Sequence, residues 1–127
     1  MPHFIIECSE NITQQLAPGY IMQAVYEVAE ASGLFAKNDI KVRIRSYSTY
    51  KLAEGKENFL HVFGYIMEGR SQEQQAALSG SVIRKLNELL PELSILSMNI
   101  QEFNQATYCN KAMINPRNTA NDRHFGL

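Results

Sequence analysis

The distribution of apolar and polar positions predicts two similar runs of strand, helix and strand. Residues 2–8 are rich in Phe and Ile, which is typical of a short buried strand, and polar turn residues follow them. We expect a short helical turn at residues 11–16, and apolar residues at helical spacing then predict a helix from Pro18 to Gly33. Residues 40–45 alternate apolar and basic, which predicts a strand with one buried face that continues to Tyr50.

The second half of the chain repeats this order. Residues 59–67 predict another strand, and residues 68–70 a turn. Ser71, with Gln74 three positions later, matches a capping box at the start of a helix. The apolar stripe of that helix comprises Leu78, Val82, Ile83, Leu86, Leu89 and Leu90, and Pro91 ends it. Residues 95–103 return as a strand with Leu96, Met98 and Ile100 on one face.

This order predicts an α+β fold in a single domain over residues 1–127. Duplicated β-α-β units, at about residues 2–50 and 59–103, form a four-stranded mixed sheet with two helices on one face. Since the other face also carries apolar side chains, we expect other subunits to cover it. Residues 104–127 are rich in asparagine and too polar for a helix of their own. They predict an extended arm with poor order beyond Arg117, and its candidate anchors are Tyr108, Cys109, Met113 and Ile114.

Composition narrows the classes of function. The chain has 127 residues, 45% of them hydrophobic, and a formal net charge of −1, which favours neither nucleic acid nor an anionic membrane as partner. No apolar run approaches the ~20 residues that span a bilayer, and the pattern of a signal peptide is absent. Two cysteines without a CxxC motif indicate a reduced, cytoplasmic protein. His3, His61 and His124 have no partner at metal-ligand spacing, so we expect no metal site.

Pro2 directly follows the initiator methionine. A proline at this position permits methionine excision, after which its nitrogen is a secondary amine at the end of a buried strand. Burial and nearby cations both disfavour the ammonium form and lower the pKa of such an amine, so that it can act as a general base. From this dipeptide alone, the plainer interpretation is that proline merely allows excision.

Several stretches of the sequence resemble proteins of a known superfamily. Residues 2–12 and Gly33-Leu34-Phe35 resemble 5-carboxymethyl-2-hydroxymuconate isomerases, while residues 66–71 with Glu73-Gln74 resemble the amino-terminal strand and turn of 4-oxalocrotonate tautomerases. Both groups belong to the tautomerase superfamily, which is built from β-α-β units and uses an amino-terminal proline. The resemblance extends over residues 2–103 and shifts the interpretation of Pro2 towards a catalytic base.

The resemblance implies a reaction and the residues that carry it. A 2-hydroxy-dienoate would become its 2-oxo-enoate as Pro2 moves a proton from the enol oxygen to a distant carbon. Fixed cations would bind the substrate's carboxylates, and arginine suits this role because its planar fork is bidentate. By its position in the turn, Arg70 is a candidate carboxylate ligand, and Arg43 matches an arginine on the family's basic strand. Lys41 stands where the family has another arginine, so it supplies charge without the fork.

The remaining candidates are less direct. The resemblance places Tyr108 where an aromatic wall lies near the proline, although a structural anchor in the arm explains it equally well. We interpret Arg45 as a surface or interface charge, and His3 and Glu7 as structural. Leu60 occupies the position equivalent to Pro2 in the second repeat and has no free amine, so one site per chain is expected.

These inferences together predict a cytoplasmic homotrimeric isomerase of aromatic-compound breakdown that acts on a small carboxylate substrate. No metal or organic cofactor is implied. Two alternatives stay open. One is a broad keto–enol tautomerase of the phenylpyruvate type, and the other is a non-catalytic trimeric binding protein of the same fold.

Overall fold

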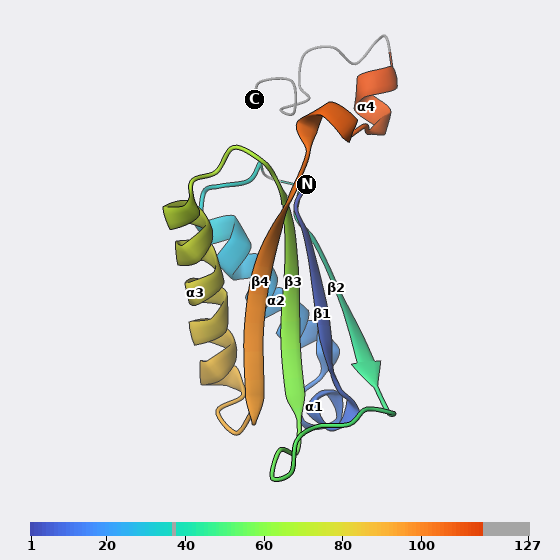
Figure 1. The fold of residues 1–127 in the computed structure, drawn as a ribbon, viewed down its shortest axis with the longest axis vertical. Coiled ribbons are helices and arrows are strands. Elements are labelled where there is room, and N and C mark those ends of the chain that lie inside the picture. Colours follow the sequence, from blue (N-terminus) through green and yellow to red (C-terminus); the bar gives the residue numbers. More distant parts are fainter. Residues whose placement is uncertain (37, 116–127) are drawn as a thin grey trace.

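The computed structural model describes residues 1–36 and 38–115. Figure 1 shows a twisted sheet with one long helix to its left and another behind it, and a C-terminal arm that projects beyond one end. In chain order the elements are β1 (His3–Ser9), α1 (Glu10–Gln15), α2 (Pro18–Ala31), β2 (Lys41–Tyr47), β3 (Phe59–Met67), α3 (Gln72–Leu89), β4 (Ile95–Phe103), the 3-10 turn η1 (Gln105–Thr107) and α4 (Lys111–Ile114).

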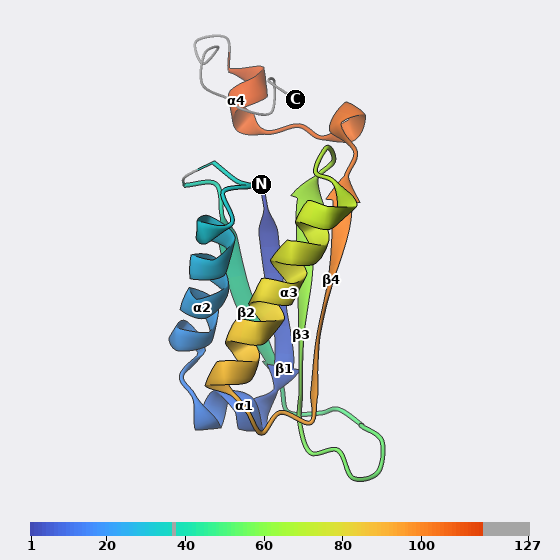
Figure 2. The ribbon, with the colours of Figure 1, turned by 90° about the vertical axis from the view of Figure 1, so that its left-hand side faces the viewer.

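The strands form one four-stranded mixed sheet in the order β2-β1-β3-β4. β1 runs parallel to β2, and β3 runs parallel to β4, while β1 and β3 are antiparallel. Each parallel pair is connected through a helix, so the two halves are β-α-β units. Figure 2 shows α2 and α3 side by side on the same face of the sheet. The predicted fold class is therefore confirmed at the level of one subunit.

The core lies between the sheet and these helices. Alternation along β1 directs Phe4, Ile6 and Cys8 to the helix side, where all three are fully buried. α3 contributes Leu78, Val82, Leu86 and Leu90 from its stripe and its C-cap. Leu89 was wrongly included in the stripe: it is 37% exposed, because it falls one position short of the buried face.

The helix ends follow the predicted chemistry. Pro18 opens α2, and Gly33 follows its C-cap with a φ of 72°, a backbone angle that glycine adopts without strain. The capping box of α3 is complete, since the Ser71 side chain accepts from the Gln74 amide and the Gln74 side chain accepts from the Ser71 amide.

The strand predicted to reach Tyr50 ends at Tyr47. The last pair in the register of β1 and β2 is Ser9 with Tyr47, so the neighbouring strand offers no further hydrogen-bond partners. The Tyr47 hydroxyl donates to the Glu7 carboxylate at 2.9 Å at this point.

The predicted extended arm is wrong over its described part, which contains η1 and α4. Asparagine favours rather than prevents these short helices, because the side chains of Asn104 and Asn110 cap them by accepting from the amides of Ala106 and Met113. Tyr108 and Met113 are half-buried as expected of anchors, whereas Cys109 is exposed and Ile114 is 72% exposed. The expectations for His124 and for order beyond Arg117 lie outside the described residues.

Candidate active site

The beginning of β1 lies at the junction of three elements. In the sheet register His3 pairs with Lys41 at the start of β2 and with Tyr65 near the end of β3. Pro2 is buried at this junction, and its carbonyl accepts a 3.1 Å hydrogen bond from the Lys41 amide. Met1 is also buried, with 7% exposed surface. In this chain the nitrogen of Pro2 is part of the peptide bond with Met1.

The outward face of the sheet forms a shallow hollow near this junction. Its volume is about 250 Å³, and its walls are His3, Ile5, Arg43, Tyr65 and Phe103. The guanidinium of Arg43 lies 3.1 Å from Nδ1 of His3 (Nη1 to Nδ1). Of the residues predicted from sequence, only Arg43 lines this hollow within the described part of the chain. The hollow thus combines one fixed cation with aromatic and aliphatic walls.

Phe103 joins the hollow to the C-terminal arm. Its ring centroid lies 6.1 Å from that of His3, 5.9 Å from that of Tyr65 and 6.1 Å from that of Tyr108. Tyr108 therefore packs against the wall of the hollow without lining it. This contact agrees with Tyr108 as an anchor of the arm, whereas Tyr65 and Phe103 form the aromatic wall of the hollow itself.

Arg70 lies at the same end of the sheet as the hollow, but on the face that the helices cover. Its Nη2 donates to the Leu34 carbonyl at 2.6 Å, and its Nη1 donates to the Met67 carbonyl at 3.4 Å. The guanidinium also lies 5.4 Å from the ring centroid of Phe35, which packs edge-on against Phe4 in the core. Arg70 thus ties the segment after α2 to the end of β3, and it does not meet Arg43 across the hollow.

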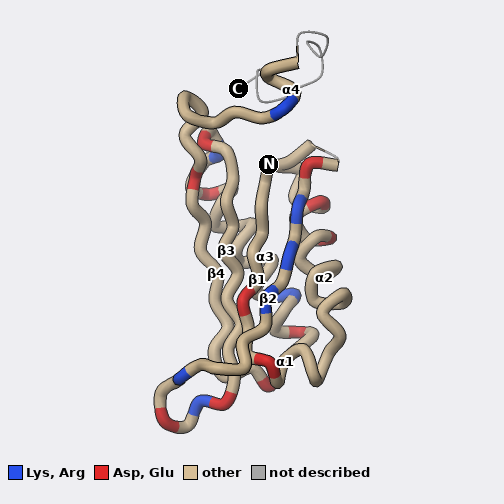
Figure 3. Tube along the Cα trace, turned by 90° about the vertical axis from the view of Figure 1, so that its right-hand side faces the viewer, with Lys and Arg blue, Asp and Glu red and all other residues tan. Residues whose placement is uncertain are grey.

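Basic residues follow one edge of the sheet. Figure 3 shows the positive positions of β2 along this edge, and the strand exposes Lys41, Arg43 and Arg45 on alternate positions. The Lys41 ammonium donates to the Asp39 carbonyl at 2.6 Å, which holds it beside the start of β2. Arg45 shares the face of Lys41 and Arg43, as predicted, but its register partner is Glu7, farther from the hollow.

The pKa of His3, the histidine beside these cations, is lowered. Burial lowers the pKa of His3, and the positive charges of Lys41, Arg43 and the chain's amino group lower it further. These charges therefore act on a group directly next to Pro2.

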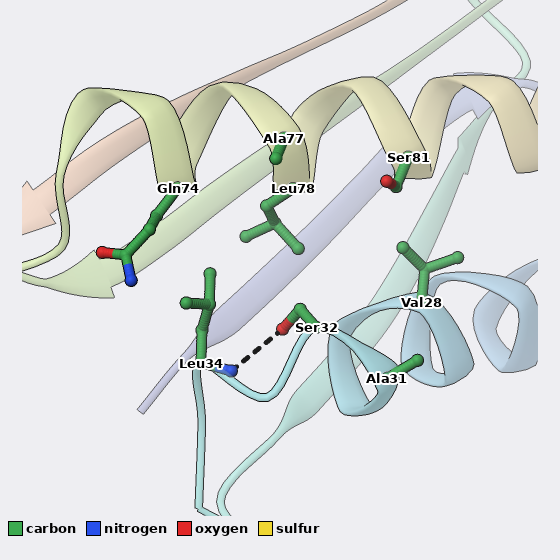
Figure 4. Close-up of a pocket in the computed structure, with 8 residues that line it drawn as sticks. All are labelled: Val28, Ala31, Ser32, Leu34, Gln74, Ala77, Leu78 and Ser81. Atoms are coloured by element: carbon green, nitrogen blue, oxygen red, sulfur yellow. Dashed lines mark hydrogen bonds between the residues drawn. The ribbon is translucent and has the colours of Figure 1, made fainter.

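A larger hollow, of about 460 Å³, lies between α2 and α3 on the opposite side of the sheet. Figure 4 shows its walls, which come from the end of α2, Leu34 and the first half of α3. None of its eight described wall residues is ionisable: they are Val28, Ala31, Ser32, Leu34, Gln74, Ala77, Leu78 and Ser81. It offers no acid or base, so the smaller hollow beside Pro2 is the candidate active site.

Sequence reasoning missed four of the five residues that line the hollow. His3 was interpreted as structural, and Ile5, Tyr65 and Phe103 were treated only as parts of strands. Period-2 alternation against the inward-facing Phe4 and Ile6 places His3 on the outward face of β1, and that signal was available in the sequence. The proximity of Phe103 depends on the β3–β4 register, which the sequence does not specify.

Within residues 1–36 and 38–115, no group of three or more His, Cys, Asp or Glu side chains is arranged to hold a metal ion. The same residues contain no helix long and apolar enough to cross a membrane.

Two β-α-β units that share one four-stranded sheet give this chain a tautomerase-like fold. More specifically, the chain belongs to the 5-carboxymethyl-2-hydroxymuconate isomerase family, whose model matches residues 2–118.

Individual relatives agree with this assignment. The chain is 32% identical over 77 residues to the 5-carboxymethyl-2-hydroxymuconate Delta-isomerase of Escherichia coli, a match that covers 59% of this chain and 61% of that protein. The matched region therefore spans less than two thirds of this relative. A 5-carboxymethyl-2-hydroxymuconate isomerase from Deinococcus radiodurans R1 superposes with a TM-score of 0.76 and 26% identity, over 87% of this chain and 88% of that one. A fused 4-OT protein, described as a symmetric trimer, shares the fold with a TM-score of 0.65 and 14% identity, over 86% and 93% of the two chains.

Proposed function

We propose that this protein is an isomerase that converts a 2-hydroxy-dienoate, such as 5-carboxymethyl-2-hydroxymuconate, into its 2-oxo-enoate isomer. The observation that carries the proposal is that two cations lie beside His3, the residue next to Pro2: Lys41 is its register partner, and the Arg43 guanidinium is 3.1 Å from its Nδ1. The same cations would keep a Pro2 amine unprotonated near neutral pH once Met1 is removed. The family assignment and the two isomerase relatives support the same reaction.

The mechanism assigns each step to a residue of this chain. The Pro2 amine takes the proton of the enol hydroxyl group and returns a proton to the distant carbon of the conjugated system, so that the double bonds shift and no atom is gained or lost. Arg43 binds a carboxylate and stabilises the negative charge that develops on the 2-oxo group. Lys41 adds positive charge at the entrance. Tyr108 supports the wall of the site through Phe103.

Arg70 has a weaker case as a substrate ligand. Its guanidinium is already engaged by two backbone carbonyls and by the Phe35 ring. We propose that it contributes to the site mainly by holding the segment that contains Leu34 and Phe35. Any direct contact with a carboxylate would require the short bond to the Leu34 carbonyl to break.

We infer that the active form is a homotrimer. The hollow of about 250 Å³ is smaller than the ~300–1,000 Å³ of typical ligand pockets, so a second surface is needed to enclose a substrate. The outward face of the sheet leaves Ile5, Phe63, Tyr65 and Phe103 only half-buried, which supplies an apolar patch for such contact. A related fold occurs in a protein described as a symmetric trimer. Removal of Met1 would vacate further volume at this end.

The cellular setting is also part of the proposal. Substrates of this class arise from ring cleavage of aromatic acids, so we place the protein in aromatic-compound breakdown. Cys8 and Cys109 are both free, which is consistent with a reduced, cytoplasmic environment.

One observation favours a second candidate function. Because Arg70 is engaged elsewhere, the hollow presents one arginine and mainly apolar walls, which would fit an aromatic substrate with a single carboxylate. A broad keto–enol tautomerase of the phenylpyruvate type is therefore the alternative. The two are separated by comparing kcat/KM for 5-carboxymethyl-2-hydroxymuconate and for phenylpyruvate enol in one preparation.

The test of the proposed function is the Pro2→Ala variant. Mass spectrometry first establishes that Met1 is absent from both proteins, and isomerisation is then followed by ultraviolet absorbance. We expect the variant to lose roughly 10²–10⁴-fold in kcat, the scale of general-base catalysis. Full activity in the variant would exclude the proline mechanism. Failure of the intact wild-type protein on all 2-hydroxymuconate derivatives would instead favour a non-catalytic binding protein.

A further inference from the structure

The hydrogen bond between His3 and Arg43 joins two residues that are not opposite each other in the sheet. Arg43 pairs with Ile5, whereas His3 pairs with Lys41, one step nearer the beginning of both strands on this face. To reach His3, the Arg43 side chain must therefore lean along the sheet towards the amino end. That is the direction of Pro2. Without this partner the long side chain of an exposed residue would be free to occupy other rotamers.

The chemistry of the pair determines the state of the histidine. A guanidinium has only N–H donors, so Nδ1 of His3 must accept the hydrogen bond through its lone pair. His3 is then neutral with its proton on Nε2. The surroundings favour this state, because burial, Lys41, Arg43 and the chain's amino group all lower the pKa of His3.

The arrangement leaves Arg43 ready to bind a carboxylate. One of its five N–H donors is used on His3, and the guanidinium still lines the hollow. Phe103 packs edge-on against the imidazole with ring centroids 6.1 Å apart, which holds the ring from its other side. The guanidinium thus has a defined place before any ligand arrives.

We propose that His3 is a positioning residue, which acts by accepting a hydrogen bond from Arg43 and so holding that guanidinium towards Pro2 for recognition of a substrate carboxylate. This inference rests on the proposed function and extends it to a residue outside the proline–arginine set. His3 need not touch the substrate.

The test measures binding separately from turnover. The probe is cis,cis-muconate, a six-carbon dicarboxylate that lacks the enol hydroxyl group, and its affinity is measured by calorimetry on the full chain after Met1 removal. His3→Phe keeps a ring but removes the acceptor, whereas His3→Asn keeps an acceptor near the place of Nδ1. We expect His3→Phe to weaken binding about tenfold, the scale of one hydrogen bond to a charged group, and His3→Asn to stay within about threefold of wild type. His61→Phe, on the same face but bonded to Ser97 and Asn99, is the matched control and should bind normally.

A double-mutant cycle then identifies the route of the effect. If His3 acts through Arg43, His3→Phe should cause no further loss of affinity in an Arg43→Ala background. Losses that multiply, or unchanged affinity in His3→Phe alone, would overturn the inference. A variant that does not fold is recognised by circular dichroism. Nitrogen NMR of the wild-type imidazole then remains as a test, because a protonated Nδ1 at pH 7.5 would also overturn the inference.

The pH profile provides a readout that a merely structural role would not move. In the wild type, muconate affinity should fall as acid protonates His3 and breaks the bond, and this limb should be absent in His3→Asn. The charged and titratable groups that face His3 are Lys41 and Arg43 from β2, Tyr65 from β3 and the chain's amino group. If the wild-type protein does not isomerise the substrate but the double-mutant cycle shows that His3 acts through Arg43, only the proposed function is contradicted. If the wild-type protein isomerises the substrate but the cycle shows no interaction between His3 and Arg43, only the inference about His3 is contradicted.

Discussion

Replacement of Arg70 by alanine should lower the stability of the protein substantially. The substitution removes a 2.6 Å hydrogen bond to the Leu34 carbonyl, a 3.4 Å bond to the Met67 carbonyl and the contact with the Phe35 ring. A hydrogen bond from a charged donor contributes about 1.5–3 kcal/mol, and a cation–π contact about 0.5–1 kcal/mol. The bond to Met67 is near the distance limit and adds little. The free energy of unfolding should therefore fall by about 2–4 kcal/mol.

The measurement is urea denaturation followed by circular dichroism. With an m-value of about 2 kcal/mol/M, the midpoint should move down by about 1–2 M. Wild type and variants are compared at equal protomer concentration, since assembly makes the midpoint concentration-dependent. Arg84→Ala is the matched control, because Arg84 is exposed on α3 and its guanidinium donates one long hydrogen bond, of 3.4 Å, to the Ser81 hydroxyl group. That control should stay within about 0.5 kcal/mol of wild type.

Arg70→Lys keeps the positive charge but removes the planar guanidinium group. Lysine can still approach one carbonyl but cannot stack on Phe35 or reach both acceptors, so an intermediate midpoint is expected. The interpretation of Arg70 as a strap between α2 and β3 is refuted if Arg70→Ala unfolds at the same urea concentration as Arg84→Ala. It is also refuted if Arg70→Lys is as stable as wild type.

Three other predictions concern separate parts of the molecule. Burial raises the pKa of the Cys8 thiol to about 11, whereas Cys109 is exposed. Ellman's reagent at pH 8 should therefore titrate one thiol in the folded protein and two in urea. Rapid reaction of both thiols without urea would contradict this prediction. A Cβ at Gly64 would lie 3.1 Å from Met98 and 3.4 Å from both Ile100 and Phe4. Gly64→Ala should therefore lower the free energy of unfolding, measured by thermal unfolding, by about 1–3 kcal/mol. Gly19→Ala, in the open first turn of α2, is the control and should not destabilise the protein. Burial and the nearby positive charges lower the pKa of His3 in the folded state, so below about pH 6.5, the ordinary pKa of histidine, the unfolded chain takes up the proton first. Wild type should therefore lose stability relative to His3→Phe as the pH falls through this range, and parallel stability curves for the two proteins would show that His3 does not contribute.

Local sequence chemistry predicted the elements well where it acts within a few residues. Pro18, Gly33 and the Ser71–Gln74 box each determine a helix end through contacts inside one turn, and the structure confirms all three. The predicted end of β2 was wrong because the length of this strand depends on where β1 stops, which is a property of the strand pairing rather than of residues 48–50. The prediction of an extended arm was wrong because its asparagines were counted only as polar residues, although asparagine is also a good N-cap.

The site shows the same division between local and long-range information. Alternation along β1 and β2 was sufficient to place Arg43 on the face that carries the hollow. The partners of Arg70, in contrast, come from a loop 36 residues away, and no local pattern indicates that a backbone carbonyl accepts its hydrogen bond. The contact of Phe103 with His3 likewise depends on how the second unit is placed against the first.

The burial of Met1 and Pro2 has a practical consequence for anyone who handles this protein. The first carbonyl after the methionine is already a rung of the sheet, bonded to the Lys41 amide. A purification tag fused ahead of Met1 would have to leave from a position with 7% exposed surface, and it would block the excision on which a free proline amine depends. Affinity tags therefore belong at the other end of the chain, and an inactive preparation tagged at the amino end says nothing about the enzyme.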